Sequence, residues 1–179
     1  LLFVRSEAPW KTLRDILQQA KAKPGTLTVG NSGFGSHTHL SSVWLFKAAG
    51  FQVVDVPFNA AQVVPSLLGG HVDAVVQLPG ALAGLLKAGT VRALVAMSGA
   101  RDPFFPDVPT AREQGMDISA ELWRGVVVPK GTPPRIIARL EDAIRKTVAS
   151  PEFTRATEKL LVAPAFLPAS SQGRRATAP

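Results

Sequence analysis

Short apolar runs alternate with amphipathic segments over the first hundred residues. Runs of branched and apolar residues bounded by turn-forming residues predict buried strands, here over Leu1–Arg5, Leu27–Val29, Phe51–Val56, His71–Val76 and Val91–Met97. Between them, apolar residues recur at helical spacing, which predicts helices over Thr12–Lys23, Ser36–Ala49, Ala60–Leu68 and Gly80–Ala88. This alternation with short loops predicts an α/β fold, a parallel sheet flanked by helices.

The pattern changes after Ser98, where prolines become frequent. Proline removes a backbone donor and interrupts regular structure. The segments predicted there are an irregular crossing over Arg101–Thr110, a short helix over Ala111–Gln114, a strand over Leu122–Val128, helices over Pro134–Ala149 and Pro151–Leu161, and a last strand over Val162–Leu167. Thr132 is expected as the N-cap and Pro133 as the first residue of the first long helix.

The most informative stretch is Thr26–Gly50, which reads as strand, glycine-rich loop and helix. Gly33 and Gly35 let the loop take positive φ or let a ligand approach its N–H groups. Ser36 is a natural N-cap, and unpaired amides at a helix start favour an anion. The alternative is a tight turn without a ligand. Leu40, Val43, Trp44 and Ala48 fall on one apolar face of the helix.

Three loops leave the carboxyl ends of predicted parallel strands, at Asn31–Ser36, Pro57–Ala60 and Gln77–Gly80. In α/β proteins such loops lie on one rim and carry the ligand site. Catalytic motifs near this rim are incomplete. A dinucleotide fingerprint would need glycine at Thr38, and a nucleophile elbow would need glycine at Phe34. We therefore expect a protein that holds a ligand without transforming it, with no enzyme activity and no cofactor.

Composition restricts the function further. The 179 residues carry a formal net charge of +7 and no cysteine, which suits an anionic ligand or a basic surface and excludes a thiolate metal site. The three histidines do not form a convincing metal set. The basic residues lack nucleic-acid patterning, and no apolar run reaches the length of a membrane span. Leu1–Val4 reads as a strand already under way, without a leader before it.

Several motifs in order along the chain resemble the substrate-binding proteins of tripartite tricarboxylate transporters, the Bug-type periplasmic solute receptors. They run from about Leu1 to Val162. The matching stretches are Pro9–Leu13, Gly30–Ser36 with His39 and Leu40, Val56–Phe58, Leu67–Gly70 with Val72 and Asp73, Lys87–Gly89 with Arg92–Leu94, Pro106–Thr110 with Glu113 and Gly115, and Trp123 with Gly125 and Pro129–Pro133.

The resemblance implies a two-lobed receptor of the type II periplasmic-binding fold. It would close on a small carboxylate such as a dicarboxylate, tricarboxylate, amino acid or aromatic acid, and present it to a membrane permease. Residues 6–122 would form one lobe, 1–5 and 123–167 the hinge strands and helices of a partial second lobe, and 168–179 a disordered tail. The main body of the second lobe would precede Leu1 and is missing here.

The expected ligand-binding residues cluster at the glycine-rich loop and its neighbours. They are Ser32, Gly33, Phe34, Gly35, Ser36, His39, Phe58 and Gln77. Backbone amides and serine hydroxyls would hold a carboxylate through charge-assisted hydrogen bonds, Phe58 would form an apolar wall and Gln77 a polar contact. His39 could instead bond within the first helical turn. Asp73 is expected to orient loop amides, and Trp44 and Trp123 to pack in the core or hinge.

One departure from the family pattern affects the ligand preference. Phe58-Asn59-Ala60 stands where the family usually has Tyr-Lys-Gly, so a hydroxyl and a cation are lost. Two other functions remain possible at this point. One is an effector-binding domain of a transcription regulator or a small-molecule sensor of the same fold, and the regulator needs a helix-turn-helix segment, which is not visible. A hydrolase or phosphoryl-transfer enzyme needs a nucleophile and base, which do not emerge.

Overall fold

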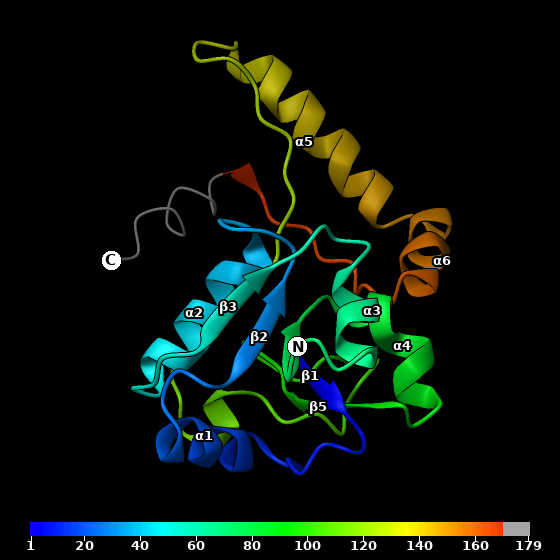
Figure 1. Ribbon diagram of the computed structural model, residues 1–179. Helices are drawn as coiled ribbons and strands as arrows, with labels where there is room; N and C mark the ends of the chain where they lie inside the picture. Colours follow the sequence, from blue (N-terminus) through cyan, green and yellow to red (C-terminus); the bar gives the residue numbers. More distant parts are fainter. Residues whose placement is uncertain (170–179) are drawn as a thin grey trace. The chain divides into compact units, whose positions relative to one another are not determined.

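Five short strands form one sheet in the order β3-β2-β4-β1-β5 (Figure 1). The structure is a computed structural model and describes residues 1–169. The strands are β1 (Leu2–Arg5), β2 (Thr28–Asn31), β3 (Val54–Pro57), β4 (Ala74–Val76) and β5 (Val91–Val95). They belong to a first compact unit that ends at Leu122, and a second unit begins at Trp123.

The prediction of a parallel sheet is correct for four strands and wrong for β1. Strand β2 pairs in parallel with β3 and β4, whereas β1 lies antiparallel between β4 and β5. Strands β4 and β5 therefore run in the same direction. The neighbours of β1 are remote in sequence, so the local alternation of strands and helices carries no information on its direction.

Helices cover both faces of this sheet. Helices α1 (Leu13–Ala22) and α2 (His37–Ala48) cover one face, and α3 (Val63–Leu68) and α4 (Pro79–Lys87) the other (Figure 1). Successive side chains of a strand point to opposite faces, so β1 contributes to two cores. Leu2 and Val4 pack with residues of α1 and α2, and Phe3 packs with residues of α3 and α4.

The predicted order of helices and strands in the first unit is confirmed, with shifted ends. Helix α1 begins at a capping box, in which Thr12 Oγ1 accepts from the Asp15 amide while the Asp15 carboxylate accepts from the Thr12 amide. Such reciprocal bonds satisfy amides that lack helical partners. Leu13, Ile16 and Ala20 then place the buried stripe of α1 against the sheet.

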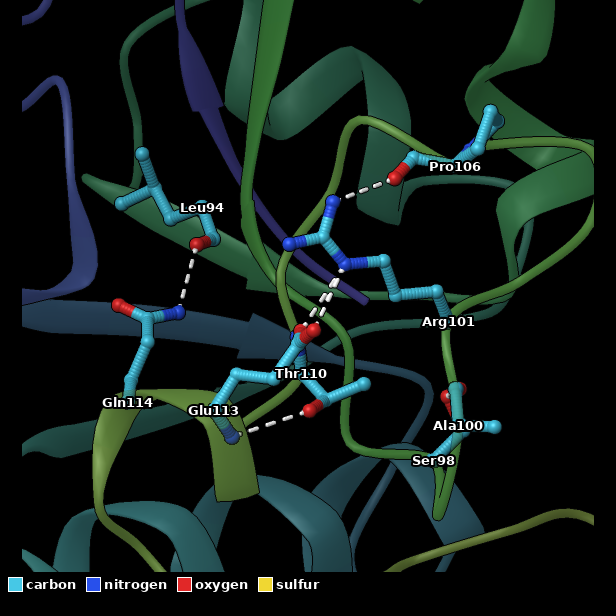
Figure 2. Close-up of polar contacts among 8 residues, drawn as sticks. All are labelled: Leu94, Ser98, Ala100, Arg101, Pro106, Thr110, Glu113 and Gln114. Carbon is cyan, nitrogen blue, oxygen red and sulfur yellow. Dashed lines mark hydrogen bonds and ion pairs between the residues drawn. The ribbon is translucent and has the colours of Figure 1, made fainter.

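The proline-rich crossing after β5 is irregular, as predicted, and one carboxylate organises it (Figure 2). Glu113 accepts from Arg101 Nε at 2.9 Å and from the Thr110 amide at 2.7 Å. Arg101 Nη1 also donates to the Pro106 carbonyl. Residues Ala96 and Thr110 form a parallel bridge, and the short helix is a 3₁₀ turn, η1, at Arg112–Gln114.

The second unit contains helices α5 (Pro134–Val148) and α6 (Pro151–Lys159). Helix α5 begins at Pro134, where the predicted range begins, but its N-cap is Pro133 and not Thr132. The strands predicted over Leu122–Val128 and Val162–Leu167 do not form. Among residues 1–169 nothing pairs with these segments, and a strand without a partner has no ladder to stabilise it.

Three sequence predictions concern the chain ends and the membrane. Most of the tail predicted over 168–179 lies outside the described residues, which end at 169. The role of residues 1–5 as a hinge strand stays a prediction, although β1 lies inside the sheet of the first unit. Within residues 1–169, no helix combines the length and apolar character needed to cross a bilayer.

Candidate functional site

The loops after β2, β3 and β4 lie on one edge of the sheet, because these three strands run in parallel. The predicted residues from these loops come together there. Gln77 Nε2 lies 3.4 Å from Ser32 Oγ. A Cβ added to Gly33 would lie 3.9 Å from the Phe58 carbonyl, and one added to Gly30 would lie 3.2 Å from the Phe58 ring. Sequence spacing therefore identified a real spatial cluster.

Helix α2 begins at this edge and Ser36 is its N-cap, as predicted. The Ser36 hydroxyl accepts a hydrogen bond from the His39 amide at 3.2 Å and lies 3.0 Å from Thr38 Oγ1. Thr38 Oγ1 also accepts from the Ser32 amide at 2.9 Å. These hydroxyls fix the loop against the first helical turn, whose amides carry the positive end of the helix dipole.

The loop amides are less free than the sequence suggested. Gly33 N donates to Asn31 Oδ1 at 3.1 Å, Gly35 N to His39 Nδ1 at 3.1 Å, and Ser36 N to the Gly33 carbonyl at 3.2 Å. In the described part of the chain, the Phe34 amide has no hydrogen-bond partner. An anion at this loop would therefore use the Phe34 amide and replace one or more of the internal acceptors.

Backbone conformation explains the two glycines of the loop. Gly33 has φ +104° and Gly35 has φ +74°, a region in which an L side chain is strained. No atom lies within 4 Å of a Cβ added to Gly35, so conformation and not space requires glycine there. Phe34, between them, has 71% of its surface exposed and meets the His39 ring edge-on at 5.1 Å.

Asn31 is a site residue that the sequence analysis missed. It is fully buried at the end of β2, and its Oδ1 accepts from Gly33 N while its carbonyl accepts from the Phe58 amide. Its Nδ2 is buried without a hydrogen-bond partner. A buried unpaired donor lowers the stability of the folded state. Here the donor belongs to the side-chain amide of Asn31, whose oxygen holds Gly33 N. An asparagine at a strand end two residues before a glycine was the available signal.

The expected orientation of α2 is reversed. Leu40 and Trp44 are 58% and 49% exposed, whereas Ser41 and Ser42 are buried against the sheet. Ser41 Oγ donates to the His37 carbonyl and Ser42 Oγ to the Asp55 carboxylate, so the buried hydroxyls are satisfied. Of the two roles predicted for Trp44, packing in the core is therefore wrong, and packing at the hinge stays a prediction.

The structure also bears on the predictions for Asp73 and Trp123. Asp73 accepts from the amide and hydroxyl of Thr28 at 2.8 Å each. Thr28 begins β2, so Asp73 secures the end of the strand opposite the loop instead of orienting loop amides. Trp123 is 56% exposed, so it does not pack in the core, and its alternative role at the hinge stays a prediction.

Two titratable groups flank the first turns of α2. Burial is the main cause that raises the pKa of Asp55, against the opposing hydrogen bond from Ser42. Burial likewise lowers the pKa of His37, although the nearby carbonyls of Ala120 and Glu121 favour its charged form. Histidine 37 is thus neutral at pH 7, and the positive potential at the loop comes from amides and the helix dipole. Among residues 1–169, no group of three or more acidic or histidine side chains could hold a metal ion.

Comparison with solved structures gives close matches over nearly the whole chain. A TctC solute-binding protein from Polaromonas is 34% identical with a TM-score of 0.85, covering 97% of this chain and 60% of that one. A protein of R. palustris solved with adipate is 28% identical with a TM-score of 0.81, covering 98% and 59%. MatC from Rhodopseudomonas palustris, solved with bound malate, is 30% identical with a TM-score of 0.76, covering 96% and 58%.

Sequence comparison agrees with these matches. The chain spans about half the length of the curated relatives it matches. It covers 51% of a relative from Cupriavidus necator and 48% of one from Pseudomonas sp. strain P51. Residues 1–174 match the family described as tripartite tricarboxylate transporter family receptor, TctC. The resemblance inferred from the motifs and the expected type II periplasmic-binding fold are both confirmed. The chain belongs to the tripartite tricarboxylate transporter receptor family, TctC.

Proposed function

We propose that this chain is part of an extracytoplasmic solute receptor that captures a small carboxylate without transforming it. The observation that carries the proposal is the glycine-rich loop at the start of α2, on the edge where the loops after β3 and β4 converge. A helix start with adjacent amides and hydroxyls binds anions well. Ser32, Gly33, Phe34, Gly35, Ser36, His39, Phe58 and Gln77 are the proposed ligand-binding residues.

The proposed ligand class is a small dicarboxylate or a related acid. Two structurally similar proteins were solved with adipate and malate, which are both dicarboxylates. Here the loop amides would take one carboxylate, and Phe58 would flank the carbon chain. Charge-assisted hydrogen bonds of this kind contribute about 1.5–3 kcal/mol each before the cost of ordering the ligand.

The proposed architecture is a two-lobed receptor, of which this chain supplies one lobe and part of the other. Residues 6–122 would form the first lobe, and residues 1–5 and 123–167 the hinge and part of the second. Two observations support this. The chain has about half the length of its curated relatives, and α5 carries Ile136, Ile137, Leu140 and Ile144 along one face without burying them. The partner would be the membrane permease of a tripartite system, and the location the periplasm.

Calorimetric titration tests the function. The full-length receptor should bind at least one member of a panel of dicarboxylates, tricarboxylates, amino acids and aromatic acids, and should release each one unchanged. This chain by itself should bind more weakly, because half of the proposed clamp is absent. Absence of binding across the panel by the full-length receptor, or turnover of a bound acid, would contradict the proposal.

Substitution of one glycine tests the loop. Gly35→Val forces a branched side chain into φ +74°, so the loop must change conformation and affinity should fall at least tenfold. Gly25→Val is the matched control, since Gly25 has φ +71°, open space around its Cβ and a position away from the loop. Each variant should lose about 1–2 kcal/mol of stability, but only Gly35→Val should lose affinity. Equal affinities would remove the loop from the site.

A further inference from the structure

His39 holds one of the amides that the proposed ligand needs. It is the third residue after the Ser36 N-cap, and its own amide donates to Ser36 Oγ. Its Nδ1 accepts from Gly35 N at 3.1 Å. Glutamate or glutamine usually occupies this position in a capping box and accepts from the N-cap amide, whereas His39 accepts from the amide one residue before the N-cap. Here the returning acceptor is an imidazole nitrogen.

An imidazole nitrogen accepts a hydrogen bond only while it is unprotonated, and both nitrogens of the charged ring are donors. Protonation of His39 therefore breaks the bond to Gly35 N. It releases that amide and adds a positive charge beside the loop. Histidine is the side chain that ordinarily makes this change between pH 5 and pH 8, and a glutamate at the same position would stay an acceptor there.

We propose that His39 couples carboxylate binding to proton uptake, because a ligand oxygen that accepts from Gly35 N displaces the imidazole, and the freed Nδ1 takes a proton from solvent. This inference rests on the proposed function of the loop. The charged imidazole then lies next to the ligand carboxylate and strengthens its binding. The site therefore selects anions, and it holds them more tightly at lower pH.

Asp55, Phe34 and His37 are the groups around His39 that bear on the inference. The Asp55 carboxylate on β3 is the acidic group that interacts electrostatically with His39. Phe34, which packs against the ring edge-on, carries no charge. His37 lies on the same helix two residues earlier, and burial opposes its protonation, so it does not supply the proton-binding group.

Calorimetry and NMR with the full-length receptor test the inference, with adipate and malate as probes. Both probes are mainly dianions from pH 6 to pH 8, and their own proton uptake is subtracted from the measured linkage. The expected affinity is about tenfold higher at pH 6 than at pH 8. Titrations in buffers of different ionisation enthalpy should show proton uptake near pH 7. In the free receptor, the Gly35 amide resonance should titrate together with the His39 ring.

Three variants separate His39 from the other histidines. His39→Asn keeps a neutral acceptor near the position of Nδ1 and cannot become charged, so its affinity should stay at the pH 8 level throughout. His37→Gln and His71→Gln should keep the wild-type pH dependence, the latter because His71 precedes β4 at the opposite edge. Parallel melting curves check that each variant folds.

The outcomes distinguish a failure of the proton coupling from a failure of the proposed function. Binding with proton uptake that disappears in His39→Asn supports the inference. Binding without proton uptake, or a Gly35 amide that ignores the titration of His39, overturns the inference and leaves the proposed function standing. Failure of the wild-type receptor to bind either probe at any pH, together with the rest of the panel, overturns both.

Discussion

Glu113 shows how one side chain fixes a long irregular segment. Its carboxylate accepts from the Thr110 amide and from Arg101, which reaches it across the proline-rich crossing (Figure 2). The hydrogen bond from the Thr110 amide is the largest cause that lowers the pKa of Glu113, followed by the bond from Arg101. Folding therefore favours the ionised carboxylate.

Stability measured over a series of pH values should reveal the contribution of the ionised Glu113 carboxylate. Since the folded pKa of Glu113 lies below the ordinary value of 4.5, the stabilisation is complete above that value and is lost as pH falls through the folded pKa. Glu113→Gln should reduce the loss of stability between about pH 5 and pH 3, measured by urea unfolding at each pH. Glu7→Gln removes an exposed carboxylate paired with Arg5 and serves as the control for the loss of one surface carboxylate. Matching curves for the two variants would contradict the assignment.

The N-caps of α1 and α2 separate stability from binding. Thr12 and Ser36 each accept a hydrogen bond from an amide of the first helical turn, and loss of such a cap costs about 1 kcal/mol. Thr12→Ala and Ser36→Ala should therefore destabilise the protein by similar amounts in chemical unfolding. Only Ser36→Ala should also weaken carboxylate binding, by about three- to tenfold, because Ser36 orders the loop. Equal binding by both variants would separate the cap from the site.

Buried hydroxyl groups determine which face of α2 packs against the sheet. The apolar residues Leu40 and Trp44 predict that their face of the helix is buried. Instead, Ser42 Oγ donates to the Asp55 carboxylate on β3, and Thr38 Oγ1 accepts from the Ser32 amide. A polar face can be buried when each group is paired. The position of those partners is a property of the sheet, so a helical pattern taken alone points to the wrong face.

The two units differ in how much apolar surface they bury. The first unit contains two clusters of buried residues around the sheet, whereas none of the residues 123–169 is buried. Local stability follows buried contacts. We therefore expect the first unit to carry the cooperative unfolding of the chain.

Hydrogen exchange measured by mass spectrometry tests this difference. Peptides that contain β1 and β4 should exchange slowly, because their amides lie in the middle of the sheet. Peptides from α5 and α6 should exchange far faster in this chain. In the full-length receptor, α5 should become protected as the second lobe covers its apolar face. Strong protection of α5 in the isolated chain would contradict this prediction.

The sequence alone determined the order of helices and strands in the first unit, the start of α1 and α2, the glycine-rich loop and the family. These features depend on local chemistry: a capping hydroxyl, a glycine at positive φ, or a run of branched residues acts through its immediate neighbours. The family followed because several such motifs occur in a fixed order.

The tertiary structure decided the direction of β1, the outward face of α2, the burial of Asn31 and the absence of strands over Leu122–Val128 and Val162–Leu167. It also decided that Gly35 N and Gly33 N already have acceptors. Each of these depends on which distant group lies opposite a strand, a hydroxyl or an amide. Local patterns state what a segment can form, and its partners in space determine what it does form.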